Sequence, residues 1–529
     1  MRFLPALLLI AATLSASANA DYMDVLFPPL AGFTHAVSSS RDSSAGHGVI
    51  LSSSAIGNSA PAIAELDGNS ANGKEVVVAS SDGTLSALSS AGTILWTAKT
   101  PNSNCGGSGN RILSSPAVGE LFGDGMPYVV IGYGGIVQKG CDGGVSAYRG
   151  IDGSLLWNFS VTKWGKRKKL HERFSSVFST PALSDTDHDG KMEIAFGSFD
   201  RHVYLLNANG SVRWYYQAAD TAWSSPAFAD LNSDGIEEVV FATDISKNTK
   251  INPPTPNGGY LYAMPSKSLK GKEIRFRTKY MWITAMDQTP FSSPVVADVL
   301  PANPGYEVIM GSGYYFSNSK GRSIKIYSGK TGKLLKSLSI STPTATSVAV
   351  ADLNGDGLLE VIASVSGATQ YGGDGRGEVL AWTPALSAAP MWSVEPSDRG
   401  AGASFQFASP VVADIDGNGS QEVLISTGRS VVVLEGESGR QLTCEDSECS
   451  ASHALYTFAG LSSTPAVGDI NSDGFPDVVA AGASSLFSGK GVVYAWTDFS
   501  TLGSAVGAMS PFTADWPQAR AAAARAGRK

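Results

Sequence analysis

Short hydrophobic runs, separated by turns rich in glycine and aspartate, follow one another along most of the chain. Within one unit, the run 76–79 is apolar throughout, whereas the run 83–88 alternates apolar and polar residues. A run that is apolar throughout indicates a strand covered on both faces, and alternation indicates a strand with one buried face. The pattern therefore predicts an all-β chain built from many short strands.

A repeated phrase sets the expected architecture. It consists of a small residue, proline, alanine or valine, an apolar residue, a small residue and an acid, followed by a Gly- and Asp-rich turn and a run of valine or isoleucine. The spacing averages about 58 residues, and all-β units at such a period are typical of propellers or solenoids. The copies begin at Pro61, Pro116, Pro181, Pro226, Pro294, Val348, Pro410 and Pro465.

Each copy is predicted to form four strands, of which the first usually begins with proline. Proline is tolerated there if the strand is the innermost of its blade and has no partner on its inner side. The copies predict an eight-bladed β-propeller with four-stranded blades, and a seven-bladed ring with one irregular copy is the alternative. Residues 49–51 are expected to supply the outer strand missing from the last blade.

The N-terminus has the features of a secretory signal. Arg2 precedes a short apolar run, and Ala18-Asn19-Ala20 fits the small-x-small cleavage pattern. The apolar run is too short to span a membrane, so an exported product, secreted, periplasmic or on the cell surface, is expected. The expected segments are a signal peptide over 1–20, an N-terminal segment contributing to ring closure over 21–57, the propeller over 58–505 and a C-terminal tail over 506–529.

Composition narrows the class of protein. Charged residues make up 16% of the chain, below the usual ~25%, and glycine is abundant at 59 residues. This balance argues against a coiled coil and against highly charged disorder. The net charge of −8 makes a nucleic-acid partner unfavourable, because binding phosphates requires a basic face.

Four cysteines occur in this expected export context. An even number of cysteines in an exported chain indicates two disulfides. The absence of a C-x-x-C motif argues against a zinc ribbon or a thioredoxin-like site. Of the three possible pairings, the most local one joins Cys105 to Cys141 and Cys444 to Cys449.

Five copies carry a nine-residue acidic loop after the first strand, with oxygen-bearing side chains at positions 1, 3, 5 and 9 and glycine at position 6. Ca²⁺ takes six to eight hard oxygen ligands, and glycine allows the reversal that directs the position-7 carbonyl at an ion. A polar turn without an ion is the alternative for any single loop, but five loops with one spacing predict about five calcium sites. The candidate ligands, including each position-7 carbonyl, are Asp185, Asp187, Asp189, Lys191 and Glu193; Asp230, Asn232, Asp234, Ile236 and Glu238; Asp352, Asn354, Asp356, Leu358 and Glu360; Asp414, Asp416, Asn418, Ser420 and Glu422; and Asp469, Asn471, Asp473, Phe475 and Asp477.

Three copies depart from this loop pattern, and no strong metal site is expected in them. Copy two has Phe122 and Tyr128 at ligand positions, and copy five has Leu300 and Pro304 in its loop. Copy one has a two-residue insertion before its last acid. The acidic and amide residues that copy one retains are Glu65, Asp67, Asn69 and Glu75.

The acidic loop between a Ser-Pro-Ala-Val-like strand and a valine-rich strand resembles the FG-GAP/VCBS repeats of integrin α-subunit N-terminal-like propellers and of many exported bacterial proteins. The resemblance covers about residues 58–500 and is specific in five copies. It implies a calcium-stabilised β-propeller, usually an adhesion or interaction module, with metal ligands at the loop positions above. The chain has Ser/Thr-Pro-Ala where integrin repeats often have Gly-Ala-Pro, which favours the bacterial branch.

The face opposite the acidic loops is the expected recognition surface. In a propeller the turns after the first and third strands share one face, and the other connections share the opposite face. Those other connections are long and uneven here, and uneven loops on a stiff scaffold are where recognition usually occurs. A protein or glycan partner is expected there, with no nucleic acid and no integral membrane segment.

Two groups of residues on that face are candidates for contact with a partner. A basic run with one tryptophan suits an anionic glycan or membrane surface, unless it is a solvated loop. An aromatic group suits a sugar or peptide, unless its members pack the loops; the repeated Trp96, Trp157 and Trp214 are expected to pack between blades. The candidates are Lys163, Trp164, Lys166, Arg167, Lys168 and Lys169 in the basic run, and Trp223, Trp282, Tyr314, Tyr315 and Phe316 in the aromatic group.

The usual catalytic signatures are missing from the sequence. HExxH and GxSxG do not occur, and Gly329-Lys330-Thr331 lacks the glycine five residues earlier that a phosphate loop needs. No catalytic residue is assigned, and a binding module is favoured over an enzyme. Two enzymes remain as alternatives: a calcium-dependent carbohydrate-active enzyme resembling polysaccharide lyases and, less favoured, a quinoprotein-like dehydrogenase, whose usual adjacent cysteine pair is absent.

Overall fold

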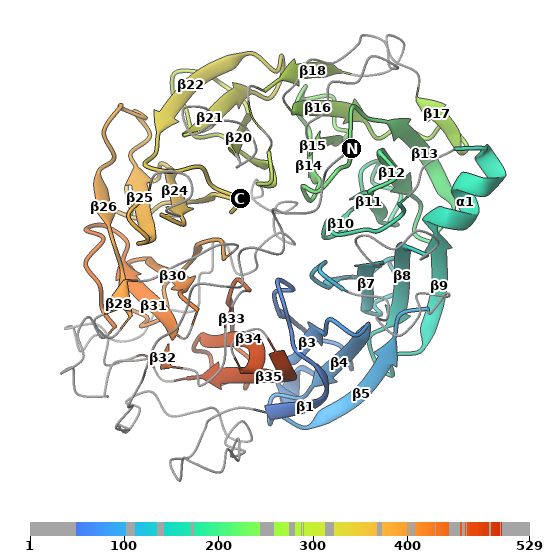
Figure 1. Cartoon of the computed structure of the whole chain (residues 1–529), viewed down its shortest axis with the longest axis horizontal. Coiled ribbons are helices and arrows are strands. Elements are labelled where there is room, and N and C mark those ends of the chain that lie inside the picture. The colour runs from blue at the N-terminus through green and yellow to red at the C-terminus, as the bar shows by residue number, and fades with distance from the viewer. Residues whose placement is uncertain are drawn as a thin grey trace.

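A computed structural model of the chain shows a ring of β-sheets around a central axis (Figure 1). Eight sheets of four or five strands form the blades, as the repeat predicts, and the seven-bladed alternative is wrong. The structure describes residues 49–101, 112–134, 142–170, 174–243, 259–274, 281–286, 288, 290–312, 322–367, 373–398, 401–402, 408–428, 430–443, 455–456, 461, 463–485, 488–497 and 499.

The first four blades follow the chain order of the repeats. Blade one contains β2 (Ala62–Ala64), β3 (Glu75–Ala79), β4 (Thr84–Leu88) and β5 (Ile94–Lys99). Blade two contains β6 (Ala117–Gly119), β7 (Tyr128–Tyr133), β8 (Gly144–Arg149) and β9 (Leu155–Ser160). Blade three contains β10 (Ala182–Ser184), β11 (Glu193–Gly197), β12 (His202–Leu206), β13 (Val212–Gln217) and, at its outer edge, β17 (Lys272–Ile274). Blade four contains β14 (Ala227–Ala229), β15 (Glu238–Thr243), β16 (Tyr260–Pro265) and β18 (Trp282–Ala285).

The remaining blades continue the same order and close the ring. Blade five contains β19 (Val295–Ala297), β20 (Glu307–Gly311), β21 (Ser323–Ser328) and β22 (Leu334–Ser339). Blade six contains β23 (Ala349–Ala351), β24 (Glu360–Val365), β25 (Glu378–Trp382) and β26 (Trp392–Val394). Blade seven contains β29 (Val411–Ala413), β30 (Glu422–Ser426), β31 (Ser430–Glu435) and β32 (Leu455–Tyr456), and blade eight contains β33 (Ala466–Gly468), β34 (Asp477–Ser485), β35 (Ser488–Trp496) and β1 (Val49–Ser54). Outside the blades lie the β27 (Ser397–Asp398) and β28 (Ala401–Gly402) ribbon, a 3₁₀ turn (Ser70–Asn72) and α1 (Val161–Lys168).

Burial follows the strand order within each blade. The second strands, such as β3 and β15, are buried at every position because neighbouring blades cover both faces. The outer strand β5 alternates, and Trp96 is its buried residue. The largest apolar cluster joins blades four to seven, with Val240, Val308, Val361 and Val423 among its members. The core is therefore a set of interfaces between blades.

Ring closure uses a strand from before the first repeat. β1 pairs antiparallel with β35, with Val49 opposite Val493 and Ile50 opposite Val492. Blade eight thus takes its outer strand from the N-terminal side of the propeller, the role expected for residues 49–51.

Tryptophans join successive blades by one repeated contact. The indole Nε1 of Trp96 donates to the carbonyl of Gly150 at 2.7 Å, and Trp392 donates to Gly436 at 2.8 Å. Trp157 donates to Ala208 and Trp282 donates to Gly329 in the same way. Trp282 is only 6% exposed, so the structure places this candidate partner residue in a seam between blades.

A helix replaces the loop expected over the basic run. Ser160 caps α1 by accepting a hydrogen bond from the amide of Lys163. Trp164, one turn in, is buried and packs 5.8 Å from Phe159 and 5.8 Å from Tyr215 between ring centroids. The expectation of an irregular loop is therefore wrong for residues 161–168, because burial of Trp164 stabilises a helix in a sequence of modest helix propensity.

Several expectations fall outside the described residues. These are the signal peptide over 1–20, the tail over 506–529, the cysteines at 105, 141, 444 and 449, and Tyr314, Tyr315 and Phe316. Within the described part of the chain, no helix is long and apolar enough to cross a membrane.

Candidate metal centres

The connection between the first and second strands of each blade is here called an acidic loop and numbered by its blade. In loop four, Asp230 at position 1 accepts the amides of Asp234 and Gly235 at 3.1 and 2.8 Å. Asp234 at position 5 accepts the amide of Ile236. In the other loops of this pattern, the amide of the position-6 glycine likewise donates to the position-1 carboxylate. These acceptors are Asp185, Asp352, Asp414 and Asp469.

The glycine at position 6 is required by the backbone. Gly235 has φ of 86° and Gly419 has φ of 90°, in the left-handed region that favours glycine. A Cβ at either position would meet no atom within 4 Å. Backbone conformation, and not crowding, therefore accounts for this glycine in the loop pattern.

In every loop except loop two, whose second strand begins with Tyr128, a buried acid begins the second strand. Its carboxylate accepts the amide of the second loop residue, as from Leu353 to Glu360 at 2.8 Å and from Ile415 to Glu422 at 2.9 Å. This anchor fixes one carboxylate below the position-1 acid. The other acids held in this way are Glu75, Glu193, Glu238, Glu307 and Asp477.

Positions 3 and 5 lie beside each other in the loops. The side-chain amide of Asn354 donates to Asp356 at 3.2 Å, and Asn471 donates to Asp473 at 2.8 Å. In loop seven, Asn418 donates to Asp416 at 2.9 Å. The loop fold therefore gathers the oxygen-bearing side chains that the sequence pattern assigned to one site.

Buried oxygens without a partner provide the test of whether a cation fits. Oδ1 of Asp414, Oε1 of Glu360 and Oδ1 of Asp477 are buried and accept no hydrogen bond from the described residues. Oδ1 of Asn232 is also buried and accepts no hydrogen bond from the described residues. Each atom belongs to a candidate ligand, and a buried carboxylate oxygen without a donor is unfavourable unless a cation neutralises it. The donor set therefore fits a hard divalent ion such as Ca²⁺.

The pKa values of the buried acids agree with this assessment. Burial, followed by the negative charge of Asp416, raises the pKa of Glu422 to about 9. Burial raises the pKa of Glu238 and Asp477 to about 7. Without a cation these carboxyls resist ionisation near neutral pH, and a bound cation favours their charged form.

Three loops bring carboxylates together most closely. In each, one oxygen from each of three acids lies within 4.8 Å of the other two. The groups are Asp185, Asp187 and Glu193 in loop three, Asp414, Asp416 and Glu422 in loop seven, and Glu65, Asp67 and Glu75 in loop one.

Loop one was expected to lack a strong site because of its insertion. The inserted residues form the 3₁₀ turn Ser70–Asn72, which is exposed. Glu75 therefore still begins the second strand and accepts the amide of Leu66 at 2.7 Å. Extra residues at the exposed tip leave the acidic base of the loop intact.

Loop three contains a cation from the protein itself. From β13, Arg213 places Nη1 2.7 Å from Glu193 and Nη2 2.5 Å from Asp187. The Arg213 side chain is 7% exposed. Sequence reasoning missed this contact, although a signal exists, because Arg213 stands before Trp214 where blades one and two have Leu95 and Leu156.

Loops two and five satisfy their acids with neutral groups. The hydroxyl of Tyr128 donates to Asp124 at 2.8 Å, and the side-chain amide of Asn303 donates to Glu307. Both donors occupy carboxylate oxygens that a metal ion would otherwise use.

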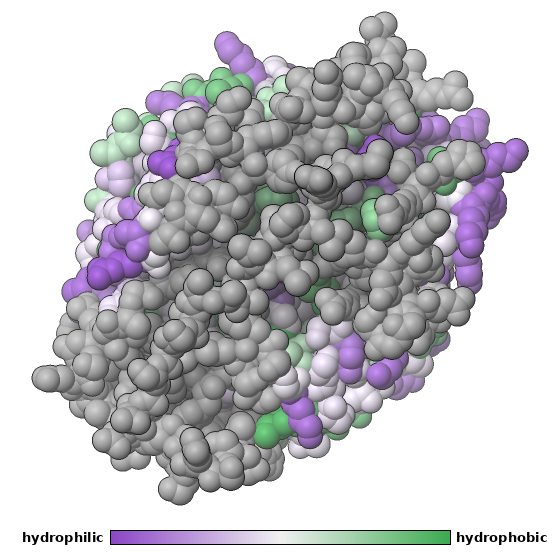
Figure 2. Space-filling view, in the orientation of Figure 1, coloured by the Kyte–Doolittle hydropathy of each residue, from purple (hydrophilic) through white to green (hydrophobic). Residues whose placement is uncertain are grey.

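The candidate partner residues do not form one surface among the described residues. Trp223 packs against Phe178, Phe199 and Phe291. The lysines of α1 are exposed at the outer rim of the ring, beside β9 and β13 (Figure 1). Figure 2 shows hydrophilic residues gathered at that same edge.

Comparison with protein-family models finds two matches. The family described as outer membrane protein assembly factor BamB matches residues 64–263. The FG-GAP repeat matches residues 344–382, which include loop six. The resemblance to FG-GAP propellers is confirmed by this match.

Solved structures with a similar fold share little sequence with the chain. BamB from Moraxella catarrhalis is 14% identical, with a TM-score of 0.49, over 85% of this chain and 98% of that chain. The V. cholerae biofilm matrix protein Bap1 is 11% identical, with a TM-score of 0.40, over 76% and 90%. Quinohemoprotein alcohol dehydrogenase from Comamonas testosteroni is 16% identical, with a TM-score of 0.38, over 82% and 66%. A comparison with curated proteins finds no match.

Proposed function

We propose that this chain is an exported, calcium-braced β-propeller that acts as an adhesion or interaction module for a protein or glycan. The FG-GAP match over residues 344–382 supports this type of propeller. The features of a secretory signal in residues 1–20 support export. A closed ring of blades with uneven outer connections is a scaffold on which recognition usually occurs.

The observation that carries the calcium proposal is the set of buried, unpartnered ligand oxygens in loops four, six, seven and eight. Calcium bound there would supply positive charge to acids that no described cation pairs. Each ion would join the position-1 and position-5 side chains to the acid that begins the second strand, and so hold the first two strands of its blade together. Loop three would hold calcium less readily, because Arg213 already pairs with Asp187 and Glu193.

Calcium titration of the EDTA-treated full chain tests the metal assignment. Isothermal titration calorimetry is expected to report several sites for Ca²⁺ and weaker binding of Mg²⁺, which prefers more rigid octahedral sites. At a free concentration ten times the dissociation constant, each independent site adds about 1.4 kcal/mol of stability. The melting temperature is therefore expected to rise by many degrees in calcium. Absence of binding heat, together with the same melting temperature in EDTA and calcium, would refute the calcium assignment.

The interaction role needs a separate test. The immobilised full chain is incubated in calcium with a panel of defined glycans and purified surface proteins, alongside a chain carrying Glu360→Gln and Glu422→Gln. The wild type is expected to bind at least one class of molecule. If calcium in the loops stabilises the recognition surface, the variant is expected to bind that class more weakly. Failure to bind any member of a broad panel would count against an adhesion module.

A further inference from the structure

We propose that the pocket beside α1 binds an acidic sugar residue of an anionic polysaccharide. This inference rests on the proposed interaction function and names its partner class. It begins from a concentration of positive charge: Lys163, Lys166, Arg167, Lys168 and Lys169 are all exposed in a chain of net charge −8. Among the described residues, no carboxylate lies within ion-pair distance of any of the five.

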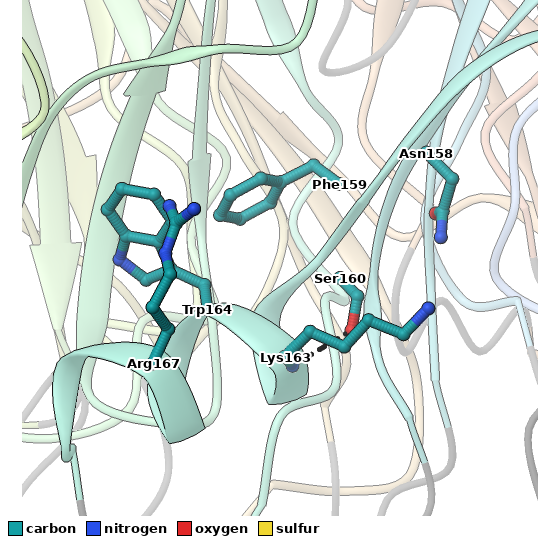
Figure 3. Close-up of a pocket in the computed structure, with 6 residues that line it drawn as sticks. All are labelled: Asn158, Phe159, Ser160, Lys163, Trp164 and Arg167. Carbon is teal, nitrogen blue, oxygen red and sulfur yellow. Dashed lines mark hydrogen bonds between the residues drawn. The ribbon is translucent and has the colours of Figure 1, made fainter.

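Helix electrostatics explain only some of these charges. Lys166, Arg167 and Lys168 lie in the last turn of α1, where the helix dipole favours cations. Lys163 lies in the first turn, where the dipole disfavours a cation. Its side chain extends along the pocket toward Asn158 (Figure 3). A bound anion gives Lys163 a stabilising contact that its place in the helix does not.

The pocket is a small cavity of about 260 Å³ between β9 and α1. Drug-sized ligands usually occupy about 300–1,000 Å³, so this cavity suits one sugar residue and not an oligosaccharide. Figure 3 shows Lys163 and Asn158 on one side and Arg167 lying over Trp164 on the other. The lining residues are Asn158, Phe159, Ser160, Lys163, Trp164 and Arg167.

The polar groups of the pocket are arranged as donors. The side-chain oxygen of Asn158 already accepts from Tyr133 and Ser146, at 2.8 and 2.9 Å. This fixes the amide, and its NH₂ group donates to no described acceptor. Together with Lys163 and Arg167, the amide offers donors and positive charge to an acceptor-rich, negatively charged ligand. Asp142 is buried and accepts from the lining residue Ser160 at 2.6 Å.

Aromatic packing holds this arrangement before any ligand binds. The guanidinium carbon of Arg167 lies 4.2 Å from the centroid of the Trp164 ring, and that ring packs on Phe159 and Tyr215. Arg167 is therefore positioned by a cation–π contact, and a preformed site loses less conformational entropy on binding. Phe159 and Trp164 are each 8% exposed and form the apolar floor of the pocket.

The same contacts favour a polysaccharide over a membrane. A helix that docks on lipid usually places aromatic or aliphatic side chains in the bilayer interface. Here Trp164 is 8% exposed and packed against the propeller, so it is not available for insertion. Lys166, Lys168 and Lys169 continue along the exposed rim, where neighbouring charged residues of a polymer would contact them.

The test measures binding of the full chain, saturated with calcium, to hyaluronan fragments, with neutral dextran as the uncharged probe. The wild type is expected to bind hyaluronan, with an affinity that falls as salt increases, and not to bind dextran. Lys163→Gln combined with Arg167→Gln is expected to weaken binding about tenfold or more, since two charge-assisted hydrogen bonds are lost. Lys330→Gln combined with Lys333→Gln, on the exposed turn between β21 and β22, is the matched control and is expected to bind normally.

Other results would overturn the proposal. Equal affinities for the two double variants would exclude the pocket, and binding to phosphatidylserine vesicles without binding to hyaluronan would identify a membrane surface instead. The calcium isotherm and melting temperature are measured on the same samples. If these are normal and hyaluronan does not bind, the sugar-acid inference fails alone; if calcium has no effect but hyaluronan binds, the metal part of the proposed function fails and the pocket stands.

Discussion

Burial determines how single residues of the acidic loops behave. Glu422 is 1% exposed, and its carboxylate lies within 4.8 Å of the oxygens of Asp414 and Asp416. Burial and these neighbouring charges raise its pKa to about 9, so without a cation the carboxyl is mostly uncharged at pH 7. A divalent ion would favour its charged form, and the three acids of loop seven would then serve as ligands.

Glu422→Gln is expected to separate these two states. Glutamine retains an oxygen for the amide of Ile415, which donates to Glu422 at 2.9 Å, but it supplies no charge to an ion. In calcium the variant is expected to bind one ion fewer and to lose about 1–2 kcal/mol. In EDTA at pH 7 its stability is expected to remain near that of the wild type, because the carboxyl is already uncharged there. Calorimetry and thermal unfolding measure both quantities.

Asp124→Asn is the control for this experiment. Asp124 lies in loop two and accepts from Tyr128, so the substitution is expected to leave the number of calcium ions unchanged. A Glu422→Gln variant that loses equal stability with and without calcium would contradict a metal role for loop seven.

Arg213→Met tests whether a protein cation takes the place of calcium in loop three. The substitution leaves Glu193, 2% exposed, without its guanidinium partner. Removal of one member of a buried ion pair costs about 3–5 kcal/mol, and this loss is expected in EDTA. In calcium much of the loss is expected to be recovered and one more ion bound, because the ion replaces the guanidinium.

The control is Arg376→Met, beside blade six. The side chains of Arg376 and Glu395 are 63% and 49% exposed and lie 3.4 Å apart, and an exposed pair of this kind contributes little. Its loss is expected to be small and independent of calcium. If Arg213→Met is equally destabilised in EDTA and in calcium, loop three does not bind the ion.

Among the elements, a repeated tryptophan contact joins the outer strand of one blade to the turn of the next. Gly153 lies in the turn between β8 and β9 with φ of 68°, and a Cβ there would lie 2.5 Å from the Trp96 ring. Gly210, Gly332 and Gly439 meet Trp157, Trp282 and Trp392 in the same way. Among the described residues, four seams therefore pair a tryptophan of one blade with a glycine of the next, and blade two supplies both Trp157 and Gly153.

Gly153→Ala is expected to destabilise the ring by about 2–4 kcal/mol, from backbone strain together with overpacking against Trp96. Gly125→Ala is the control, since Gly125 has a similar φ of 74° but no atom within 4 Å of its Cβ position. The control is expected to lose about 1 kcal/mol from strain alone. Thermal unfolding in EDTA measures both, and equal losses would show that the contact with Trp96 contributes nothing.

The sequence predicts those elements whose signal is local. Strands and turns recur in the same order in each copy of the repeat. The spacing of the eight copies predicts the blades, because each unit buries its faces only against its neighbours. The bonds within loops four, six, seven and eight follow from residue spacing, since they join residues two to seven positions apart.

Features that depend on distant packing were not predicted. α1 forms around Trp164 only because Phe159 and Tyr215 cover that ring. Arg213 reaches loop three from β13, and the intact base of loop one depends on an insertion folding outward. The seam position of Trp282 likewise becomes clear only when β18 is aligned beside the turn of blade five.

For the whole molecule, stability depends on how the first and last blades are joined. On one side β1 forms strand hydrogen bonds with β35. On the other, Ser53 pairs with Ser80 at 2.7 Å, and the amide of Ser54 donates to Asp82 at 3.3 Å. β1 therefore links blade eight to blade one, and each of these contacts holds the ring closed.

Asp82 makes this joint sensitive to pH. Burial alone would raise the pKa of Asp82, but hydrogen bonds from Thr84 and Ser54 outweigh burial and hold the pKa below its usual value. A carboxyl whose pKa is lower in the folded state stabilises the fold above its unfolded pKa of about 3.9, and this stability is lost as the pH falls through the folded pKa. The contribution is therefore present at neutral pH and absent in strong acid.

Asp82→Asn is expected to lower the free energy of unfolding by about 1 kcal/mol at pH 7, since Asp82 is partly exposed and its bonds compete with water. The effect is expected to shrink in strong acid, as the pH falls through the lowered folded-state pKa and the wild-type carboxyl becomes protonated. Both measurements are made in EDTA, so that acid release of calcium does not contribute. Hydrogen exchange is expected to quicken at the amides of β1 and β35, because the joint opens before the blades unfold.

Asp152→Asn provides the matched comparison for ring closure. Asp152 accepts the amide of Ser154 at 2.8 Å in the turn between β8 and β9, and hydrogen bonds from the side chain and the amide of Ser154 lower its pKa as well. Within the described part of the chain it makes no hydrogen bond to β1, so its loss is expected to leave exchange at β1 and β35 unchanged. If the two variants exchange alike at these strands, Asp82 acts only within its own turn, and the closing joint depends on the pairing of β1 with β35.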